Sequence, residues 1–379
     1  MASEMSLRNA RIVLEDSIVE GSVLIRDGRI VRIDAGASRT GEDFDGDYLV
    51  PGLVELHTDH LESHYSPRPG VRWDPTAALQ AHDAQVAGSG ITTVFDCLRL
   101  GSDENAGFEH GEMRRISDAL ASAQSQDRLR AEHRVHLRCE VSAADVLEQF
   151  ADFEDDPLVG LVSLMDHAPG QRQFQTMGQY ELYYKKKRGL SDAQFDAFVA
   201  ERQAASQLYS GPHRTAIAGH CRQRGISIAS HDDATLAHVG EAIGFGVRLA
   251  EFPTSLEAAR ASHEAGLSVL MGAPNVVRGG SHSGNIAALD LARHGILDVL
   301  SSDYVPISLI HAPFVLAGGD DGIDLPTAMR LVTATPARTV GLDDRGRIAP
   351  GLRADLVRVR HDGGVPVVRS VWREGRRVA

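Results

Sequence analysis

Short runs in which apolar and polar residues alternate occur at both ends of the chain. Five such runs can be recognised, over residues 10–14, 21–25, 29–33, 355–359 and 365–372. Asp27-Gly28 and the residues 361–364 each separate two of these runs and are typical of hairpin turns. Because neither end is long enough to bury a core alone, we expect residues 1–50 and 346–379 to pair into one small β-sandwich.

The chain between these ends shows a different pattern, in which apolar runs of strand length alternate with helix-like segments. Eight such runs are present, over residues 53–56, 91–95, 135–137, 161–165, 226–229, 247–250, 267–271 and 297–300. Helical periodicity separates several of them, for example over 76–87, 113–124 and 256–264. This alternation predicts an α/β fold, a (β/α)8 TIM-like barrel over residues 51–345. A doubly wound parallel sheet would produce the same alternation, so that fold stays open.

The longest gap between two apolar runs, residues 168–224, is too long for one crossover helix. It contains a segment rich in tyrosine and lysine, 179–188, and an amphipathic helix is expected over 192–208. An insertion of this length after the carboxyl end of a strand is commonly functional. We therefore expect 168–224 to form either a lid over the substrate or a contact between subunits.

The composition restricts the class of protein. The 379 residues carry 39 Lys and Arg against 52 Asp and Glu, a net charge of −13, which argues against general binding to nucleic acid. No apolar stretch approaches the roughly 20 residues of a membrane span, and no signal-peptide pattern opens the chain. The three cysteines are widely separated, which predicts neither disulfides nor a zinc ribbon. These features predict a cytoplasmic protein that binds neither nucleic acid nor membranes.

The lysines of this chain are confined to one place. They are Lys185, Lys186 and Lys187, and every other Lys or Arg position holds arginine. Chemistry that requires a lysine elsewhere, such as a Schiff base, is therefore excluded. The P-loop pattern GxxxxGK[ST] is also absent.

Side chains that can bind metals occur where five of the apolar runs end. They are His57 and Asp59 after the first run, Glu140 after the third, His167 after the fourth, His231 after the fifth and Asp303 after the eighth. In a barrel the carboxyl ends of all strands meet on one face, where active sites lie. Imidazoles combined with carboxylates bind Zn²⁺, Mn²⁺ or Fe²⁺ and leave room for an activated water. The sequence therefore predicts a divalent metal site at this face.

The motifs around these residues resemble those of the amidohydrolase superfamily. The resemblance is carried by Val50-Pro51-Gly52-Leu53 leading into His57, by Ser302-Asp303, and by Ala354-Asp355-Leu356-Val357 near the carboxyl terminus. It implies a metal-dependent hydrolase barrel with a β-sandwich built from both termini.

A narrower resemblance covers nearly the whole chain. Motifs similar to those of one family of phosphonate-catabolism hydrolases, from the carbon–phosphorus lyase pathway, occur at 55–59, 136–140, 163–171, 229–235 and 271–285. That family hydrolyses α-D-ribose 1-methylphosphonate 5-triphosphate to the 5-phosphate and diphosphate. The resemblance therefore implies a diphosphatase acting on a phosphorylated sugar.

The chain departs from the commonest superfamily pattern at two places. The usual HxH of the first strand is here His57-x-Asp59, and the usual bridging carboxylated lysine is missing, so Glu140 is expected to bridge. The resemblance then implies a metal pair held by His57, Asp59, Glu140, His167, His231 and Asp303. A site that holds one ion instead of two is the alternative that stays open. Asp303 is implied to accept the proton of the attacking water, besides or instead of binding metal.

A triphosphate requires cations and amide donors, which an acidic protein must concentrate locally. The loop after the seventh run offers Arg278, Gly279, Gly280, Ser281 and His282, although such a loop also serves as a tight connection. Further candidates, each with a solvated or structural role as the alternative, are Arg68, Arg72, Arg172 and Lys186.

Several interpretations stay open at this point. His60, His64 and His82 neighbour the first strand, and we expect them to contact substrate or stabilise structure rather than bind metal. Cys97 and Cys139 are expected to be inert. Other functions are an ordinary amidohydrolase acting on a cyclic amide or N-acyl group, and a barrel kept as a non-catalytic subunit. A homodimer is expected from base rates, and contact with other enzymes of the phosphonate pathway stays open.

Overall fold

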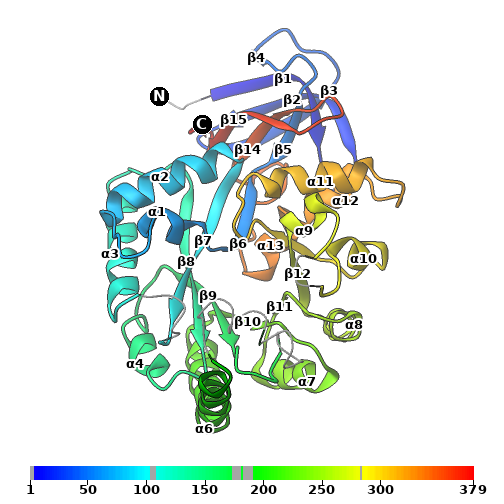
Figure 1. Ribbon diagram of the computed structural model, residues 1–379. Coiled ribbons are helices and arrows are strands. Elements are labelled where there is room, and N and C mark those ends of the chain that lie inside the picture. Colours follow the sequence, from blue (N-terminus) through cyan, green and yellow to red (C-terminus); the bar gives the residue numbers. More distant parts are fainter. Residues whose placement is uncertain (1–3, 103–107, 173–180, 182–190, 282–283) are drawn as a thin grey trace.

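A computed structural model of the protein consists of a barrel with a β domain packed at one end (Figure 1). It describes residues 4–102, 108–172, 181, 191–281 and 284–379. Both ends of the described chain lie in the β domain, and helices surround the barrel.

Strands from both ends of the chain form the β domain. They are β1 (Glu4–Val13), β2 (Ile18–Arg26), β3 (Arg29–Ala35), β4 (Glu42–Asp43), β5 (Tyr48–Pro51), β14 (Leu356–Arg360), β15 (Val367–Arg373) and β16 (Arg376–Arg377). Hydrogen bonds join them into one sheet in the order β16-β15-β14-β5-β1-β2-β3, with β4 beside β1. The two halves meet where β14 runs antiparallel to β5, and their shared core includes the stacked rings of Phe44 and Trp372. The predicted composite β unit is confirmed.

Eight parallel strands form the barrel, and each contains or overlaps one of the eight predicted runs. They are β6 (Leu53–Thr58), β7 (Ile91–Leu100), β8 (Glu132–Glu140), β9 (Val159–Met165), β10 (Ser227–His231), β11 (Leu249–Glu251), β12 (Ser268–Gly272) and β13 (Val299–Ser301). Neighbouring strands follow the order of the sequence from β6 to β13. A doubly wound sheet would reverse that order at a switch point, so the barrel is confirmed.

The first and last strands meet at a seam that closes the barrel. Thr58 and Asp303 form a parallel bridge, in which Asp303 N donates to His57 O at 3.2 Å and Asp59 N donates to Asp303 O at 3.0 Å. The carboxylate of Glu55 reinforces the seam, because it accepts from the amide of His57 at 2.7 Å and from that of Ser302 at 2.5 Å. The seam thus fixes the backbone of Asp303 against the strand that carries His57 and Asp59.

Helices cover the barrel and connect its strands. Those described are α1 (His60–Tyr65), α2 (Pro75–Gly88), α3 (Glu112–Ser125), α4 (Val146–Ala151), α6 (Asp192–Arg224), α7 (Leu236–Phe245), α8 (Leu256–Glu264), α9 (Ala273–Arg278), α10 (Ala288–Arg293), α11 (Ser308–Gly318), α12 (Leu325–Arg330) and α13 (Ala334–Thr339). The predicted helices over 76–87, 113–124 and 256–264 correspond to α2, α3 and α8.

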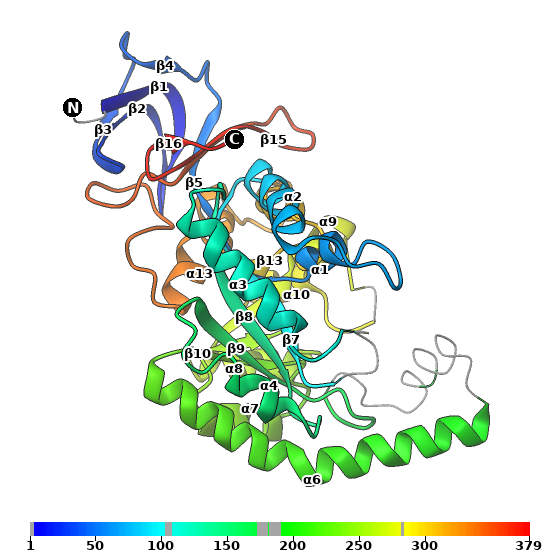
Figure 2. The ribbon, with the colours of Figure 1, turned by 90° about the vertical axis from the view of Figure 1, so that its left-hand side faces the viewer.

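The helix expected over 192–208 continues to Arg224 as α6, which spans the end of the molecule opposite the β domain (Figure 2). Ser191 and Gln194 form a capping box at its start, and Gly225 ends it in the left-handed conformation. The carboxylate of Asp166 accepts from Ser206 at 2.8 Å and from Ser210 at 2.7 Å, which holds the middle of α6 against the end of β9. The second half of the predicted insertion is therefore a crossover helix. Most of its first half, including Lys185, Lys186 and Lys187, lies outside the described residues.

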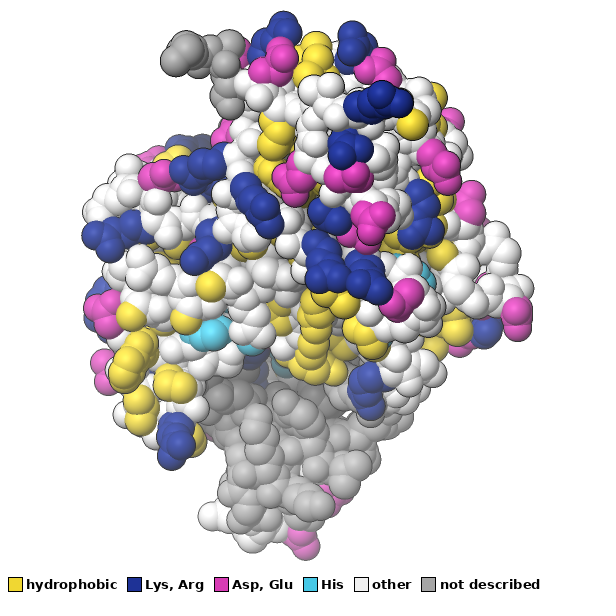
Figure 3. All heavy atoms as spheres, turned by 90° about the horizontal axis from the view of Figure 1, so that it is seen from above, with side chains coloured by type: hydrophobic (Ala, Val, Ile, Leu, Met, Phe, Trp, Pro, Cys, Tyr) yellow, Lys and Arg dark blue, Asp and Glu magenta, His cyan; other side chains and the backbone are white. Residues whose placement is uncertain are grey.

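The surface around the β domain mixes charges of both signs. Figure 3 views the molecule from that end, and basic and acidic side chains are interspersed over the described residues of this face, with no broad basic area among them. Within the described part of the chain, no helix has the length and apolarity needed to cross a bilayer.

A buried ion-pair network joins the barrel to the segment that returns to the β domain. Glu132, at the start of β8, contacts Arg345 at 2.7 Å and Arg353 at 2.6 Å, and Arg353 also contacts Asp355 at 3.0 Å. Burial acts to raise the pKa of Glu132, but the two guanidinium groups outweigh it and lower this pKa to about 2. The carboxylate therefore stays ionised down to strongly acidic pH.

We expect Glu132→Gln to lower the free energy of unfolding by about 3 kcal/mol at pH 7, because it leaves two buried guanidinium groups without their shared carboxylate. The matched control is Glu15→Gln, since Glu15 pairs with Arg338 and Arg347 at longer distances, 3.5 and 3.6 Å, and is more exposed. That control should cost less than about 1 kcal/mol. Urea denaturation of the three proteins measures both values.

The pH dependence provides a second check on the same variant. A carboxylate whose folded pKa is lowered contributes stability above its unfolded pKa, and loses it as the pH falls toward the folded value. The difference between wild type and Glu132→Gln should therefore be complete above the ordinary value of 4.5 and shrink as the pH falls toward about 2. A difference that is independent of pH over this interval would contradict the network.

Candidate metal centre

A cavity of about 350 Å³ opens at the carboxyl ends of the barrel strands. Its lining includes His57, Asp59, Arg138, His231, Asp232, Asn275, Arg278, Ser281, Asp303 and Tyr304. Asp232 and Phe252, which directly follow β10 and β11, and Asp303, the second residue after β13, have left-handed backbones with φ of +57°, +52° and +53°. The left-handed residues turn the chain sharply after each strand, so that their side chains stay at the strand ends.

The carboxylate of Glu251, at the end of β11, holds two of the predicted ligands. It lies 3.1 Å from His57 Nδ1 through one oxygen and 3.1 Å from His231 Nδ1 through the other. Burial acts to raise the pKa of Glu251, but the charge of His57 and the hydrogen bond from His231 outweigh it, so this pKa lies well below its ordinary value. An ionised carboxylate can only accept, so each Nδ1 donates to Glu251, and Nε2 is the ring nitrogen left to bind a ligand.

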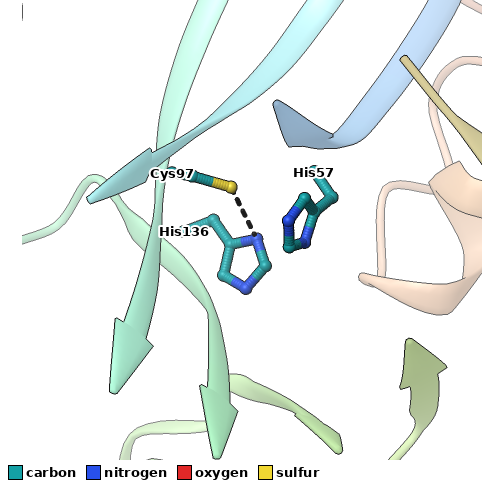
Figure 4. A group of neighbouring side chains, drawn as sticks. All are labelled: His57, Cys97 and His136. Atoms are coloured by element: carbon teal, nitrogen blue, oxygen red, sulfur yellow. Dashed lines mark hydrogen bonds between the residues drawn. The ribbon is translucent and has the colours of Figure 1, made fainter. Parts of the chain in front are cut away.

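Further buried side chains extend this network below the cavity. Ser163 Oγ donates to Glu251 at 2.6 Å, and His136 Nδ1 lies 2.9 Å from the carbonyl oxygen of Leu56. Figure 4 shows Cys97 beside His57 and His136, with its sulfur 3.5 Å from His136 Nδ1. Burial raises the pKa of the Cys97 thiol to about 11 and lowers that of His136 to about 3, so in the protein alone both are neutral at pH 7. Cys97 lies closer to the predicted ligands than its sequence context indicated.

A second carboxylate orients His167 in the same way. Glu140 Oε2 lies 2.6 Å from His167 Nδ1, and the other oxygen accepts from the hydroxyl of Ser142 and from the amide of His167. Burial acts to raise the pKa of Glu140, but His167 outweighs it and lowers this pKa to about 2. His167 therefore turns its Nε2 toward Asp232, whose Oδ2 lies 3.9 Å away.

The donor atoms of His167, His231 and Asp232 fit a divalent metal. His231 Nε2 lies 3.6 Å from Asp232 Oδ2, so His167, His231 and Asp232 converge on one point. Asp232 Oδ2 is buried and has no hydrogen-bond partner among the described residues, a costly arrangement that a bound cation would relieve. Two imidazoles and a carboxylate form a ligand set typical of Zn²⁺, Mn²⁺ and Fe²⁺. A further triad, His57, His231 and Glu251, shares His231 with this group.

The other predicted ligands are placed differently. Asp303 lines the cavity at the barrel seam, next to the strand that carries His57. Asp59 also lines the cavity, but its carboxylate contacts Arg138 at 2.5 Å and Arg99 at 3.1 Å. Glu140 is engaged with His167 and does not appear in the cavity lining as the structure describes it. The structure thus brings five of the six predicted ligands to one region through histidine and aspartate side chains, with Glu140 as the partner of His167.

Among the described residues, the glycine-rich loop that begins at Arg278 contributes side chains, rather than the backbone amides of its glycines, to the cavity. Arg278 and Ser281 line the cavity. The amides of Gly279 and Gly280 instead donate to carbonyl oxygens of α9, at 3.1 and 2.9 Å, and so end that helix. His282 and Lys186 lie outside the described residues.

The remaining arginine candidates are not among the described residues that line the cavity. Arg72 contacts Glu112 at 2.8 Å and stacks on Phe108, and buried Arg172 is paired with Asp233 and Glu241. Arg68 is exposed in the loop between α1 and α2. A role of these three residues in binding substrate stays a prediction.

The predicted set of site residues omits Glu251, Asp232 and Arg138. Glu251 directly follows the sixth apolar run, 247–250, so the rule applied to five other runs would have found it. Asp232 follows His231 in the same motif. Arg138 lies inside a strand, and nothing in its local sequence indicates that its side chain reaches the cavity.

Comparisons with known proteins show the family to which this chain is related. The sequence profile of the amidohydrolase family matches residues 87–379. Over 377 residues, which cover 99% of this chain and 100% of the relative, the protein is 46% identical to α-D-ribose 1-methylphosphonate 5-triphosphate diphosphatase of Escherichia coli strain K12.

Solved structures share the fold at low sequence identity. N-acetylglucosamine-6-phosphate deacetylase of Pasteurella multocida superposes with a TM-score of 0.65 at 13% identity, covering 98% of this chain and 99% of that one. A Xaa-Pro dipeptidase superposes with a TM-score of 0.65 at 15% identity, covering 99% of each chain. At these identities the likeness concerns the fold alone.

We expect Glu251→Gln to weaken metal binding by about 10–100-fold while the barrel stays folded, because the amide cannot accept from two Nδ1–H groups as the carboxylate does. Equilibrium dialysis against Zn²⁺, with circular dichroism to monitor folding, measures this change. Glu257→Gln, at an exposed position on α8, is the matched control and should bind metal as wild type does. Equal affinities in all three proteins would exclude the orienting role of Glu251.

Proposed function

The chain belongs to the amidohydrolase family, whose members depend on metal, and we propose that it hydrolyses α-D-ribose 1-methylphosphonate 5-triphosphate to the 5-phosphate and diphosphate. The observation that carries this proposal is the relative of that name, which is 46% identical over its full length. The substrate is a small phosphorylated sugar of phosphonate catabolism, and the site lies at the carboxyl face of the barrel, where such chemistry occurs in this fold.

The reaction is a hydrolysis at phosphorus. Water forms a bond to the α-phosphorus, the bond from that phosphorus to the bridging oxygen breaks, and diphosphate leaves with the electron pair. One proton from the water must be accepted during the attack, and the charge on the phosphate oxygens must be neutralised. We assign both tasks to residues of the cavity.

The site is proposed to bind two divalent metal ions, of zinc, manganese or iron. His167, His231 and Asp232 would hold one ion, and His57 with Asp59 or Asp303 would contribute to the second, with Glu140 and Glu251 orienting the imidazoles. When bound, such ions supply an electrophilic centre and a water whose pKa is lowered toward neutrality.

Asp303 is proposed to accept the proton. Its carboxylate lines the cavity, and the seam hydrogen bonds to His57 and Asp59 fix its backbone relative to the strand that carries two proposed ligands. A carboxylate held near cations stays ionised and is ready to accept a proton.

Arginine side chains are proposed to bind the phosphate oxygens. Arg138 and Arg278 line the cavity, and Asn275, Ser281 and Tyr304 offer uncharged polar groups nearby. Arg138 is ion-paired with Asp59, so a phosphate group would compete with that carboxylate or share the guanidinium with it.

The cytoplasm is proposed as the compartment of this protein, and a homodimer as its assembly. The three cysteines are free and buried, which fits a reducing compartment such as the cytoplasm. A homodimer is proposed from base rates alone, and sedimentation velocity would test it.

The function predicts that ³¹P NMR of the metal-loaded enzyme with this substrate shows diphosphate and a 5-monophosphate as products. In ¹⁸O-labelled water the label should enter the 5-monophosphate, because attack occurs at the α-phosphorus. Label in the diphosphate would place the attack elsewhere. Unchanged substrate in the presence of bound metal would redirect the search to cyclic amides and N-acyl groups, the alternative that the superfamily allows.

We expect Asp303→Asn to lower kcat by about 10²–10⁴-fold with the fold retained. Asparagine tolerates the left-handed backbone at this position, where φ is +53°, so the seam should stay intact. The matched control is Asp127→Asn, an exposed aspartate with φ of +52° that pairs with Arg376. Turnover of Asp303→Asn near the wild-type rate, with an unchanged circular dichroism spectrum, would remove Asp303 from the mechanism.

A further inference from the structure

Two arginines lie side by side near the carboxyl ends of neighbouring barrel strands. Arg99 on β7 and Arg138 on β8 are paired residues of the parallel ladder that joins these strands. Arg138 is only 6% exposed and lines the catalytic cavity, whereas Arg99 is half-buried and is not among the described lining residues. Because two positive charges at paired positions repel each other, this arrangement requires an anion close to both guanidinium groups.

The carboxylate of Asp59 supplies that negative charge. Arg138 Nη1 donates to both of its oxygens at 2.5 Å, and Arg99 Nη2 donates to one of them at 3.1 Å. Arg99 also contacts Glu62 at 3.0 Å, so two carboxylates balance the two guanidinium groups. Asp59 belongs to the cavity lining as the structure describes it and Arg99 does not, so Asp59 separates Arg99 from a ligand in the cavity.

Within the described residues, the two arginines hold the side chain of Asp59 and the barrel seam holds its backbone. The amide of Asp59 donates to Asp303 O at 3.0 Å, and although Asp59 directly precedes α1, its carboxylate does not cap that helix. Rotation of the side chain alone would therefore release the arginines and leave the seam intact. Arg138 Nη2 has no hydrogen-bond partner in the described part of the chain, so it offers two N–H groups to a ligand.

We propose that Arg99 and Arg138 together bind one phosphate group of the triphosphate, and that this group displaces the carboxylate of Asp59. The arginine pair, Arg99 and Arg138, is then a binding site that Asp59 occupies until the substrate arrives. Guanidinium groups are planar and bind phosphate oxygens through paired hydrogen bonds, so two of them can hold one phosphate group from two sides. The inference rests on the proposed function for the identity of this anion.

The displacement favours a doubly charged group over a singly charged one. Asp59 already gives the arginine pair one negative charge, so a monoanion that replaces its carboxylate brings no additional charge. A phosphate dianion replaces one negative charge by two, and after Asp59 has moved it contacts both arginines. Its apparent affinity is the intrinsic affinity multiplied by the fraction of molecules in which Asp59 has left the pair. Asp59 therefore makes the site weaker and more selective for highly charged anions.

The test is to measure the affinity of the metal-loaded, full-length protein for inorganic phosphate by isothermal titration calorimetry, with circular dichroism to monitor folding. We expect Asp59→Asn to bind phosphate about tenfold more tightly than wild type, the gain if Asp59 leaves the pair open in about one molecule in ten. The amide has the size of the carboxylate but no charge with which to hold the two guanidinium groups.

Arg99 should be responsible for this gain, because it meets the ligand only after Asp59 has released it. In the Asp59→Asn background we therefore expect Arg99→Ala to return the phosphate affinity to the wild-type value or below. The matched control in the same background is Arg130→Ala, which removes an arginine that precedes the amino end of β8 and pairs with Asp83 at 3.1 Å. It should keep the gain.

A second control separates displacement from a general effect of charge. Glu62→Gln removes the other carboxylate at Arg99 but leaves Asp59 on both arginines, so its gain should be much smaller than that of Asp59→Asn. Equal gains in these two variants would overturn the proposal. So would the absence of a gain in Asp59→Asn, the result if Asp59 mainly binds a metal ion that itself holds the phosphate.

The other end of the substrate is tested with monomethyl methylphosphonate, which carries a single charge. It should bind wild type more weakly than phosphate does, and tighter binding would overturn the assignment to the triphosphate. Because phosphate binding requires no turnover, the outcome is independent of the hydrolysis experiment. Protein that binds phosphate as expected but leaves the ribose triphosphate unchanged would refute the proposed function and not the anion site.

Discussion

The candidate metal centre depends on one buried carboxylate that contacts two imidazoles from different strands. Glu251 accepts from His57 at the end of β6 and from His231 at the end of β10, so a single side chain sets the tautomer and the orientation of both rings. Such a carboxylate is stable in the core only because these donors, with Ser163, satisfy its oxygens. Glu140 repeats the arrangement for His167. The two anions that lie behind the rings therefore leave the Nε2 atoms of the three histidines to bind a metal.

Barrel closure supplies the second constraint. Residues distant in sequence meet at the seam, where Glu55 accepts from the amides of His57 and Ser302 and where Thr58 pairs with Asp303. Burial raises the pKa of Glu55 to about 7, since the carboxyl group is enclosed between these two strands. The proposed proton acceptor thus owes its position to the same backbone contacts that close the barrel. A change that opened the seam would therefore also displace Asp303.

The sequence predicted the positions of strands better than the contacts of charged groups. Eight apolar runs gave eight barrel strands, because burial on both faces leaves a continuous apolar signal that is local in the chain. The partners of Arg72 and Arg172 lie 40 residues or more away, at Glu112 and at Asp233 and Glu241, and such pairing leaves no local pattern. Helix α6 continues past residue 208, the predicted end, and passes through Gly211 and Pro212. Asp166 anchors this part of the helix through Ser206 and Ser210, a contact that the local sequence does not reveal. The sequence showed residues of metal-binding type at the strand ends. It did not show which of them would bind the metal and which carboxylates would orient the histidines.

The most direct test of this account is a crystal structure of the metal-loaded protein with anomalous diffraction at the absorption edge of the metal. The account predicts an ion bonded to His231 Nε2, with Glu251 still hydrogen-bonded to Nδ1 of both His57 and His231 and not itself in contact with the ion. An ion bonded directly to Glu251, or to the Nδ1 atoms that it now engages, would contradict the orienting role on which the proposed centre rests.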